Sequence, residues 1–533
     1  MEYNTWLTLI PTALVLILAL TTRKIITSLL MGILSAAIIA TNFAIIPALK
    51  QILFRSSQVF LDSDTIYFSV MLFVVGTIIS LVIRTGGAQA IGNIIIKKSA
   101  SKKSAETASL MLSSSLFIDD YLNSLTTGYV MRNLTDTFKI PRVKLAFLIG
   151  TTSSIVVLAP ISSWIGFLIG QLSSAGISLN LANKPLIYAD PFFVYLKTIP
   201  FILYPIIMII STWFIVRKKI SFGPMYHHEK IAHEDGNLFG GKKDIAHNLQ
   251  TATQSGSISD FILPIGSLII LIILGMPYSG GYHVFGGEHS FVESFQHAKS
   301  FIVLCFASLF SLILSLIFAI VRKKIEINEI PKLILSGIQM MFMSTIMILC
   351  AWVFGDFLKY DLNTGTYLAN LILGTISINL MPLMIFLSSF IIALSIGSSW
   401  GTIAIITPIA LPMLITLTNT QITPITPENI IMLLPCLGAI FAGALAGNNL
   451  SPISDVTFMA STSSGAYTVD LIQARFYYVL PAIIATAAGF LALGFLINKS
   501  FYLALFSSLV LGILISWSLL LLLQYLFHKK RKH

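Results

Sequence analysis

Long apolar runs, separated by short polar or basic segments, follow one another along most of the 533-residue chain. Residues 66–83 and 501–527 are two such runs. A helix needs about 20 apolar residues to cross a bilayer, so these runs have the length of membrane spans. A polar and charged stretch, residues 217–260, separates two groups of runs. The pattern predicts an all-α polytopic membrane protein made of two halves.

The composition supports this fold class and limits the kinds of binding partner to expect. Only 10% of the residues are charged and 56% are hydrophobic, whereas soluble domains carry roughly 25% charged residues. The net charge of +11 arises from Lys and Arg residues that stand in short clusters between the apolar runs, as in the cytoplasmic loops of membrane proteins. We therefore expect membrane lipid around the chain and no nucleic acid as a partner.

The basic clusters also predict how the chain is oriented. Arg23 and Lys24 follow the first run, and residues 528–533 form a basic tail. If each run crosses the membrane once, these clusters lie on the cytoplasmic side, with the N-terminus outside and the C-terminus inside. The expected segments are N-terminal spans (1–60), a first transport repeat (61–216), a cytoplasmic connector (217–259), linking spans (260–330), a second transport repeat (331–500), and a terminal span with the basic tail (501–533).

Two apolar runs are interrupted in a similar way. Ala159-Pro-Ile-Ser-Ser163 in the first half is echoed by Ser451-Pro-Ile-Ser-Asp455 in the second. Proline and hydroxyl groups inside a span indicate a broken or re-entrant helix, which is tolerated only where it is buried or lines a cavity. Paired broken helices are typical of secondary transporters with inverted-topology repeats and a site at the midplane. The alternative is chance recurrence of common membrane residues.

The most informative polar group is the adjacent pair Asp119 and Asp120, set among apolar residues. On a helix, Asp120 shares a face with Asn123, Ser124 and Thr127, because positions i, i+3, i+4 and i+7 are neighbours. Oxygen ligands of this kind at membrane depth suit a hard cation such as Na⁺, or a relayed proton. The alternative is an Asp pair that caps a helix in a polar loop.

Four polar breaks can converge on one site. They supply carboxylate, amide and hydroxyl oxygens and no Cys or His, so a structural zinc site is excluded. Neighbouring carboxylates titrate as a unit, and competition between Na⁺ and H⁺ for them is a sufficient basis for exchange. The candidate ion- and substrate-binding residues are Asp119, Asp120, Asn123, Ser124, Thr127, Ser162, Ser163, Ser398, Ser399, Thr402, Asn448, Asn449, Ser451, Ser454, Asp455 and Thr457.

Other chemistry has weaker support in the sequence. There is no HExxH, GxSxG or Walker A motif, so neither an enzyme nor an ATP-driven pump is expected. His227, His228 and His233 lie in the polar connector, where a solvated loop is a more probable setting than a metal site. No cofactor is expected. A scaffold without transport is disfavoured because it would not need two polar broken helices.

Several segments resemble the NhaC-type Na⁺/H⁺ antiporter family. The resemblance covers most of the chain in the same order, from about residue 70 to residue 481. It implies a bacterial inner-membrane secondary transporter built from inverted repeats, which exchanges Na⁺ for H⁺ or, in relatives, transports organic acids or amino acids. The matching segments are Arg84-Thr-Gly-Gly-Ala-Gln-Ala90, Phe117-Ile-Asp-Asp-Tyr-Leu-Asn-Ser-Leu125, Ala159-Pro-Ile-Ser-Ser-Trp164, Gly397-Ser-Ser-Trp-Gly-Thr402 and Ser451-Pro-Ile-Ser-Asp455.

The chain departs from this family in two places. Where the family usually has Gly-Asp-His, this chain has Gly447-Asn448-Asn449, and where it often has an Asp, this chain has Gly150-Thr151-Thr152. Fewer titratable groups leave two hypotheses open. The first is Na⁺/H⁺ antiport, and the second is Na⁺- or H⁺-coupled transport or exchange of an amino acid or small organic acid.

We predict distinct roles for the site residues. Asp120 and Asp455 are the expected titratable Na⁺ ligands, with Asn123, Ser399 and Asn449 as neutral ligands. Asp119 is expected to shape the titration of the pair. The expected partners are Na⁺, H⁺ and membrane lipid, together with an amino acid or organic acid under the second hypothesis. A homodimer is left open.

Overall fold

The fold is almost entirely helical. The computed structural model describes residues 6–22, 24–97, 101–180, 185–243, 256–372, 377–418 and 424–529. Within these ranges, nine helices are long and apolar enough to cross a membrane, which confirms the predicted all-α polytopic class. Two segments, Pro191–Phe201 and Leu203–Glu234, form a bent pair at 44°. Arg23 and the tail beyond Lys529 lie outside the described residues.

The two halves contain the same succession of elements. In each half a long helix is followed by a short helix, a helical hairpin, a broken helix and further spans. The first half comprises α4 (Ser63–Thr85), α5 (Gly87–Lys97), the hairpin α6 (Lys102–Ser115) and α7 (Asp120–Thr137), the broken helix α8 (Arg142–Thr152) and α9 (Ser163–Ser174), then α10 (Pro191–Thr198) and α11 (Leu203–Lys218). The second comprises α16 (Ile330–Asp356), α17 (Thr364–Ile372), α18 (Met381–Ile396) and α19 (Ser399–Leu417), α20 (Leu433–Leu450) and α21 (Asp455–Ser464), then α22 (Thr468–Leu496).

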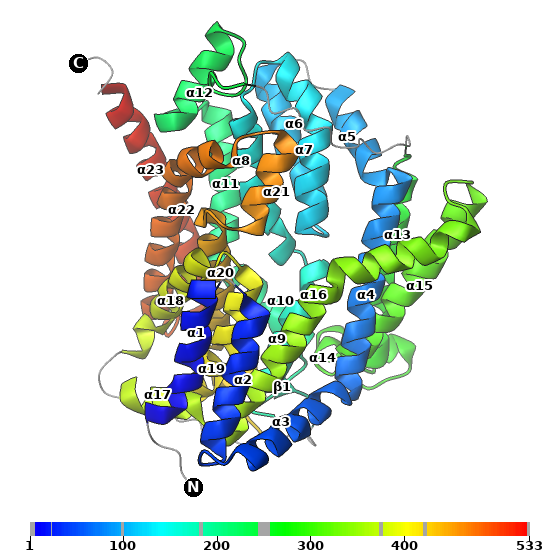
Figure 1. Cartoon of the computed structure of the whole chain (residues 1–533), viewed down its shortest axis with the longest axis vertical. Helices are drawn as coiled ribbons and strands as arrows, with labels where there is room; N and C mark the ends of the chain where they lie inside the picture. The colour runs from blue at the N-terminus through cyan, green and yellow to red at the C-terminus, as the bar shows by residue number, and fades with distance from the viewer. Residues whose placement is uncertain are drawn as a thin grey trace.

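The two halves run in opposite directions. Figure 1 shows the α6–α7 hairpin in the upper part of the molecule and the α18–α19 hairpin in the lower part. Likewise α9 lies below α8, whereas α21 lies above α20. Pro160 and Pro452 both fall in the gaps between half-helices, because proline lacks the N–H that would continue the helix. The repeats are therefore inverted, as predicted, and both hairpin tips reach the middle of the molecule.

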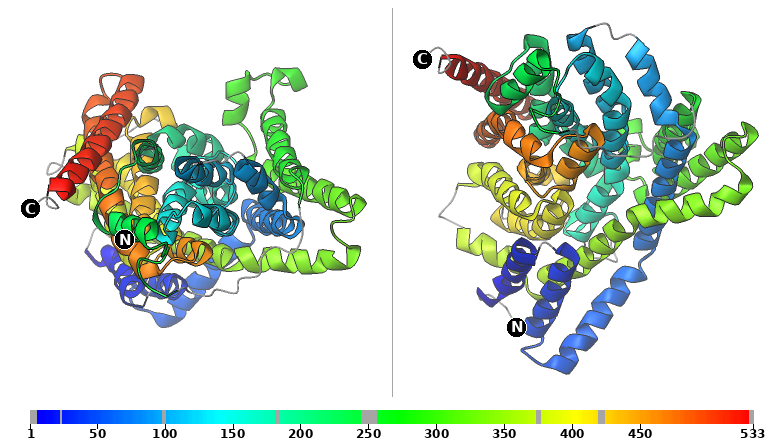
Figure 2. Two further views of the ribbon diagram at one scale, coloured as in Figure 1. Left: turned by 90° about the horizontal axis from the view of Figure 1, so that it is seen from above. Right: turned by 45° about the horizontal axis from the view of Figure 1, so that its top comes forward.

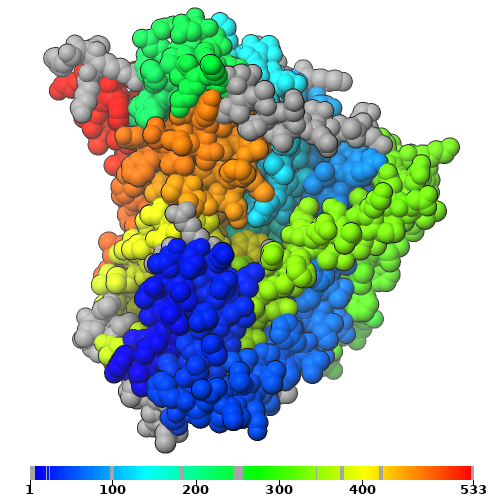
Figure 3. Space-filling model, in the orientation of Figure 1, coloured from blue at the N-terminus to red at the C-terminus, as the bar shows by residue number. Residues whose placement is uncertain are grey.

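The remaining elements surround these repeats. Figures 1 and 2 show α13 and α15 on one side of the molecule and α22 and α23 on the other, with the two termini at opposite ends. On the face seen in Figure 3, the N-terminal helices cover the lower left beside the side chains of α16. These elements are α1 (Ile10–Thr22), α2 (Ile25–Ala40), α3 (Ile45–Phe60), α12 (Gly223–Glu234), α13 (Ser259–Ser279), α14 (Phe291–Gln296), α15 (Ser300–Val321), α23 (Phe501–Lys529) and the short parallel strands β1 (Ile177–Ser178) and β2 (Ile187–Tyr188).

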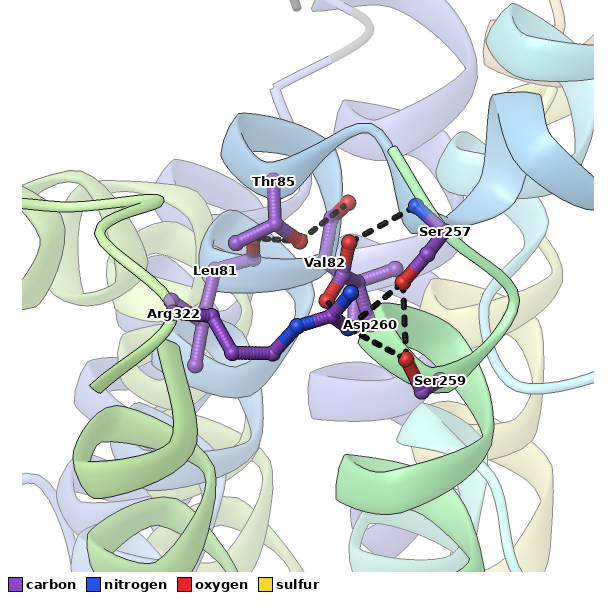
Figure 4. Close-up of polar contacts among 7 residues, drawn as sticks. All are labelled: Leu81, Val82, Thr85, Ser257, Ser259, Asp260 and Arg322. Carbon is purple, nitrogen blue, oxygen red and sulfur yellow. Dashed lines mark hydrogen bonds and ion pairs between the residues drawn. The ribbon is translucent and has the colours of Figure 1, made fainter. Parts of the chain in front are cut away.

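A polar clamp ties the start of α13 to the end of α15, beside the end of α4 (Figure 4). Arg322 donates to the Asp260 carboxylate at 3.2 Å and to the Ser257 hydroxyl at 2.7 Å, and the Ser257 amide donates to Asp260 at 2.8 Å. Gly256 lies so close to α4 that an added Cβ would be 2.1 Å from the Gly86 carbonyl oxygen. The clamp therefore joins α13 to α15, and the end of α4 packs closely against the start of α13.

The connector is more ordered than its polarity suggested. Residues 223–234 form helix α12, and His228 is buried on it, 4.0 Å from the Asp470 carboxylate. Glu229 of α12 pairs with the buried Lys144 of α8, which also pairs with Glu106 of α6 at 3.0 Å. The histidines thus lie on a docked helix, because charged partners on the repeats hold it. Residues 244–255 of the connector lie outside the described residues.

Candidate functional site

Each of four half-helices begins in the middle of the molecule with a capping side chain. These caps accept hydrogen bonds from backbone amides that would otherwise lack partners at a helix start. The positive ends of four helix dipoles therefore point into one region. The caps are Asp119 for α7 (from Leu122 N, 2.7 Å), Ser162 for α9 (from Trp164 N, 3.3 Å), Ser398 for α19 (from Gly401 N, 3.2 Å) and Ser454 for α21 (from Thr457 N, 3.4 Å).

Each hairpin tip is locked against a helix of a broken pair. In the first half, the Ser163 amide donates to the Ile118 carbonyl at 2.7 Å. In the second, the Ser399 hydroxyl donates to the Ala444 carbonyl at 3.1 Å. Gly397 adopts a φ of 75° at the second tip, where an added Cβ would lie 2.7 Å from Ile453. The tips therefore require tight backbone turns, and these turns position the residues that follow them.

Two small cavities lie between the tips and the breaks. Their volumes are about 30 and 10 Å³, and Asp120, Trp164 and Asn448 line both. One water occupies about 30 Å³ of liquid, and a cavity of about 10–15 Å³ accessible to its centre can hold it. The larger cavity also contacts Tyr121, Ser398, Ser399, Trp400 and Asp455, and the smaller contacts Ser153, Ser154 and Asn449.

The two aspartates of the larger cavity differ in exposure. Asp120 is the first residue of α7 and is only 8% exposed. Asp455 is the first residue of α21 and is exposed, as is Tyr121 at 38%. Asp120 thus forms the closed end of the cavity, and Asp455 lies at its mouth. The two carboxylates come from opposite halves of the sequence, and the inverted repeat brings them together.

Six of the candidate residues line the cavities: Asp120, Ser398, Ser399, Asn448, Asn449 and Asp455. The Asn448 side-chain oxygen is buried and has no hydrogen-bond partner among the described residues. Asn449 donates to the Tyr204 hydroxyl at 3.2 Å. Asn448 therefore presents a free acceptor where the cavities meet, whereas Asn449 is tied to α11.

The other candidates form the framework of the site. Asn123 exchanges two hydrogen bonds with Ser113 of α6, at 2.7 and 2.8 Å, so its amide is directed away from both cavities. Ser124 and Thr127 are buried near it, on the face that packs against neighbouring helices. Asp119 is a helix cap, as the alternative interpretation proposed, but it is buried rather than in a polar loop. Two serines are helix caps, Ser162 and Ser454, and two others adjoin the breaks, Ser163 and Ser451. The Thr402 hydroxyl donates to the Ser398 carbonyl, and the Thr457 hydroxyl donates to the Ser451 carbonyl.

Sequence reasoning missed the aromatic side of the site. Trp164 and Trp400 line the larger cavity with ring centroids 5.3 Å apart, and Phe167 stacks on Trp400 at 4.4 Å. The sequence did contain a signal for these rings, because Tyr121 follows Asp119-Asp120 as Trp400 follows Ser398-Ser399. The aromatic rings close one side of the cavity with bulky apolar surface.

A much larger cavity, of about 720 Å³, lies elsewhere in the molecule. Its lining includes Asp62, Asp64, Asp356 and Trp352, and it shares no lining residue with the two small cavities. Arg55 also lines it and pairs with Asp361 at 2.9 Å. Its lining residues belong to the junction of α3 and α4, to α9, α15 and α16, and to the segment just after α16.

Inverted repeats, two hairpins with tips in the middle of the molecule and two broken helices around an oxygen-lined cavity define a secondary transporter. The sequence profile of the Na⁺/H⁺ antiporter family matches residues 155–495. The chain therefore belongs to the Na⁺/H⁺ antiporter family, as the motifs predicted.

The chain is also similar to individual known proteins, at different levels of identity and coverage. An uncharacterized protein of Haemophilus influenzae is 28% identical over 495 residues, which cover 91% of this chain and 90% of that protein. The malate-2H⁺/Na⁺-lactate antiporter of Bacillus subtilis is 34% identical over 109 residues, 20% of each chain. The YdaH transporter of Alcanivorax borkumensis is 13% identical, with a TM-score of 0.50 over 82% of this chain and 87% of that one, and is similar in fold alone.

Proposed function

We propose that this transporter exchanges Na⁺ for H⁺ at the cavity between Asp120 and Asp455. The observation that carries the proposal is that two carboxylates from opposite repeats line one cavity of about 30 Å³, together with Ser398, Ser399 and Asn448. Hard cations are bound by carboxylate, hydroxyl and amide oxygens. A cavity of this size has room for only about two waters, which suits an ion that has lost most of its hydration shell.

The geometry supports competition between the two ions. Each carboxylate begins a half-helix, where the positive end of the dipole favours its charged form. The buried position of Asp120 opposes an uncompensated charge, so its carboxylate needs either a proton or a cation. When Na⁺ occupies the cavity the proton leaves, and when protons occupy both carboxylates Na⁺ has no counter-charge. Alternate opening of the site to the two sides would then exchange the ions.

A second candidate function is Na⁺- or H⁺-coupled transport of an amino acid or small organic acid. Four helix N-termini converge on the site, and such ends attract the carboxylate groups of anionic substrates. The free acceptor of Asn448 adds a group that can hydrogen-bond a polar solute. The name of the Bacillus subtilis relative mentions malate and lactate. The small volume of the cavities favours the ion-only candidate.

Proton flux in proteoliposomes tests both candidates. The purified chain would be reconstituted with a pH-sensitive dye inside, and Na⁺, lactate, malate and amino acids would be added singly and in pairs. Na⁺ alone is expected to drive proton movement. Proton movement that requires an organic solute as well as Na⁺ would favour the second candidate, and no response to any addition would contradict both.

We further propose that the protein lies in the bacterial inner membrane with its N-terminus outside and its C-terminus in the cytoplasm. The termini lie at opposite ends of the molecule, and α12, which follows Arg217 and Lys218 at the end of α11, lies at the same end as the C-terminus (Figure 1). The positive-inside rule assigns that side to the cytoplasm.

Cysteine labelling checks the orientation. The native Cys305, Cys350 and Cys436 would first be replaced by alanine, and Trp6→Cys and His528→Cys would then be made separately. A membrane-impermeant maleimide is expected to label Cys at position 6 in intact spheroplasts, and position 528 only after lysis. Labelling of position 528 in intact spheroplasts would contradict the orientation.

A further inference from the structure

Arg475 of α22 is a buried cation with no anionic partner in the part of the chain that the structure describes. It is only 1% exposed, and no carboxylate of the described residues lies within ion-pair distance of it. One guanidinium nitrogen, Nη2, donates to the Thr457 hydroxyl at 2.5 Å and contacts the Ser451 carbonyl at 3.5 Å. The other, Nη1, has no hydrogen-bond partner among the described residues. An unpaired charge at membrane depth is expensive and usually functional.

The position of the guanidinium is one that a metal cation could occupy. Ser451 is the C-cap of α20, so its carbonyl lies at the negative end of that half-helix dipole. The Thr457 hydroxyl, in the first turn of α21, also bonds to the Ser451 carbonyl at 3.2 Å. A carbonyl and a hydroxyl oxygen at an unwound break are the ligands that hard cations prefer. Arg475 therefore places its positive charge on oxygen atoms suited to Na⁺.

This charge lies directly behind the transport cavities. Tyr204 is close enough to Arg475 for an electrostatic interaction, and its hydroxyl accepts from Asn449. Asn449 in turn lines the smaller cavity with Asp120. One polar layer thus separates the guanidinium from the carboxylate site, with low-dielectric surroundings that screen charge weakly.

We propose that Arg475 is a tethered cation that takes the place of a second Na⁺ at the α20–α21 break. As a result, the site binds one Na⁺ per cycle. The proposal rests on Na⁺/H⁺ exchange at the Asp120–Asp455 cavity. If Arg475 only held α22 against the α20–α21 break, it would make the same hydrogen bonds, but its removal would not change how many ions bind.

The chain also offers a position at which the charge can be neutralised without removing Arg475. A Cβ added to Gly150 of α8 would lie 3.4 Å from Nη1 of Arg475 and 3.7 Å from the Cβ of Ala460. Both distances are ordinary contacts, so a side chain fits there. An aspartate at position 150 would reach the free edge of the guanidinium, and asparagine has nearly the same shape without the charge.

The first test measures initial proton flux against Na⁺ concentration in proteoliposomes for the wild type, Arg475→Gln and Arg475→Lys. The wild type and Arg475→Lys keep one cation at the break and are expected to show Hill coefficients of about 1. Arg475→Gln vacates the position, and its coefficient should rise towards about 2. A folded Arg475→Gln protein with the coefficient and Na⁺ affinity of the wild type would overturn the proposal.

The second test does not depend on the folding of an Arg475 variant. Gly150→Asp, by neutralising the guanidinium, should raise the apparent Na⁺ affinity several-fold because less positive charge opposes the ion, whereas Gly150→Asn should leave it near the wild-type value. Equal affinities in both variants would overturn the proposal. A wild type without any Na⁺-driven flux would instead refute Na⁺/H⁺ exchange itself, and the tethered-cation role with it.

Discussion

Asp120→Asn and Asp455→Asn should each abolish Na⁺-driven proton flux, or reduce it by at least about tenfold. Each change removes one full charge from a cavity only large enough for an ion, and one charge at close range is worth more than ~1.4 kcal/mol, a factor of ten in affinity. The amide also cannot carry the proton that Na⁺ displaces. Residual flux should therefore depend less steeply on pH. The measurement is initial flux in proteoliposomes over a series of pH values.

Asp190→Asn is the matched control for these two variants. Asp190 is also a buried aspartate that caps a helix, α10, and it accepts from Ser300 at 2.5 Å, but it lines neither small cavity. Because asparagine can still cap the helix, flux should stay near the wild-type value. Full exchange with an unchanged pH profile in both Asp120→Asn and Asp455→Asn would refute the assignment.

Asn448→Asp should raise the apparent Na⁺ affinity by on the order of tenfold and shift the pH range of activity. The residue lines both cavities with a free acceptor, so the new carboxylate would face the ion directly. Even at ~8 Å and an effective dielectric constant of ~20, one added charge is worth about 2 kcal/mol, which exceeds the ~1.4 kcal/mol of a tenfold change in affinity. Asn449→His should have a smaller effect on affinity, because its side chain is turned to Tyr204.

Asn133→Asp separates this local effect from a change in net charge. Asn133 is exposed on α7, the helix that begins with Asp120, and lines neither cavity. The Asn133→Asp substitution adds the same charge as Asn448→Asp. The Na⁺ affinity of this variant should match that of the wild type, because solvent screens an exposed charge. Unchanged affinity and pH profile in Asn448→Asp would show that position 448 does not take part in ion binding.

The sequence by itself determined the class of protein and the places where its helices break. Apolar runs of spanning length leave only helices, because a backbone in lipid must satisfy its own hydrogen bonds. Pro160 and Pro452, each beside hydroxyl residues, marked two of the breaks, because proline lacks a backbone donor, and both lie in the gaps between half-helices. Together with the echo between the two halves and the resemblance to the antiporter family, these breaks predicted the inverted repeats, and the polar residues beside them supplied Asp120, Asn448 and Asp455 as candidates.

Only the tertiary structure decided which polar residues face the cavity. Asp119 and Asp120 are chemically identical neighbours, yet α7 begins between them, so one caps the helix and the other faces the cavity. Asn123 shares a helical face with Asp120, but Ser113 of α6 binds its amide. Arg475 is visible in the sequence as a charge within an apolar span, but only the structure shows that no carboxylate of the described residues pairs with it. Partners from segments far apart in the chain meet only after packing, and local pattern contains no information about them.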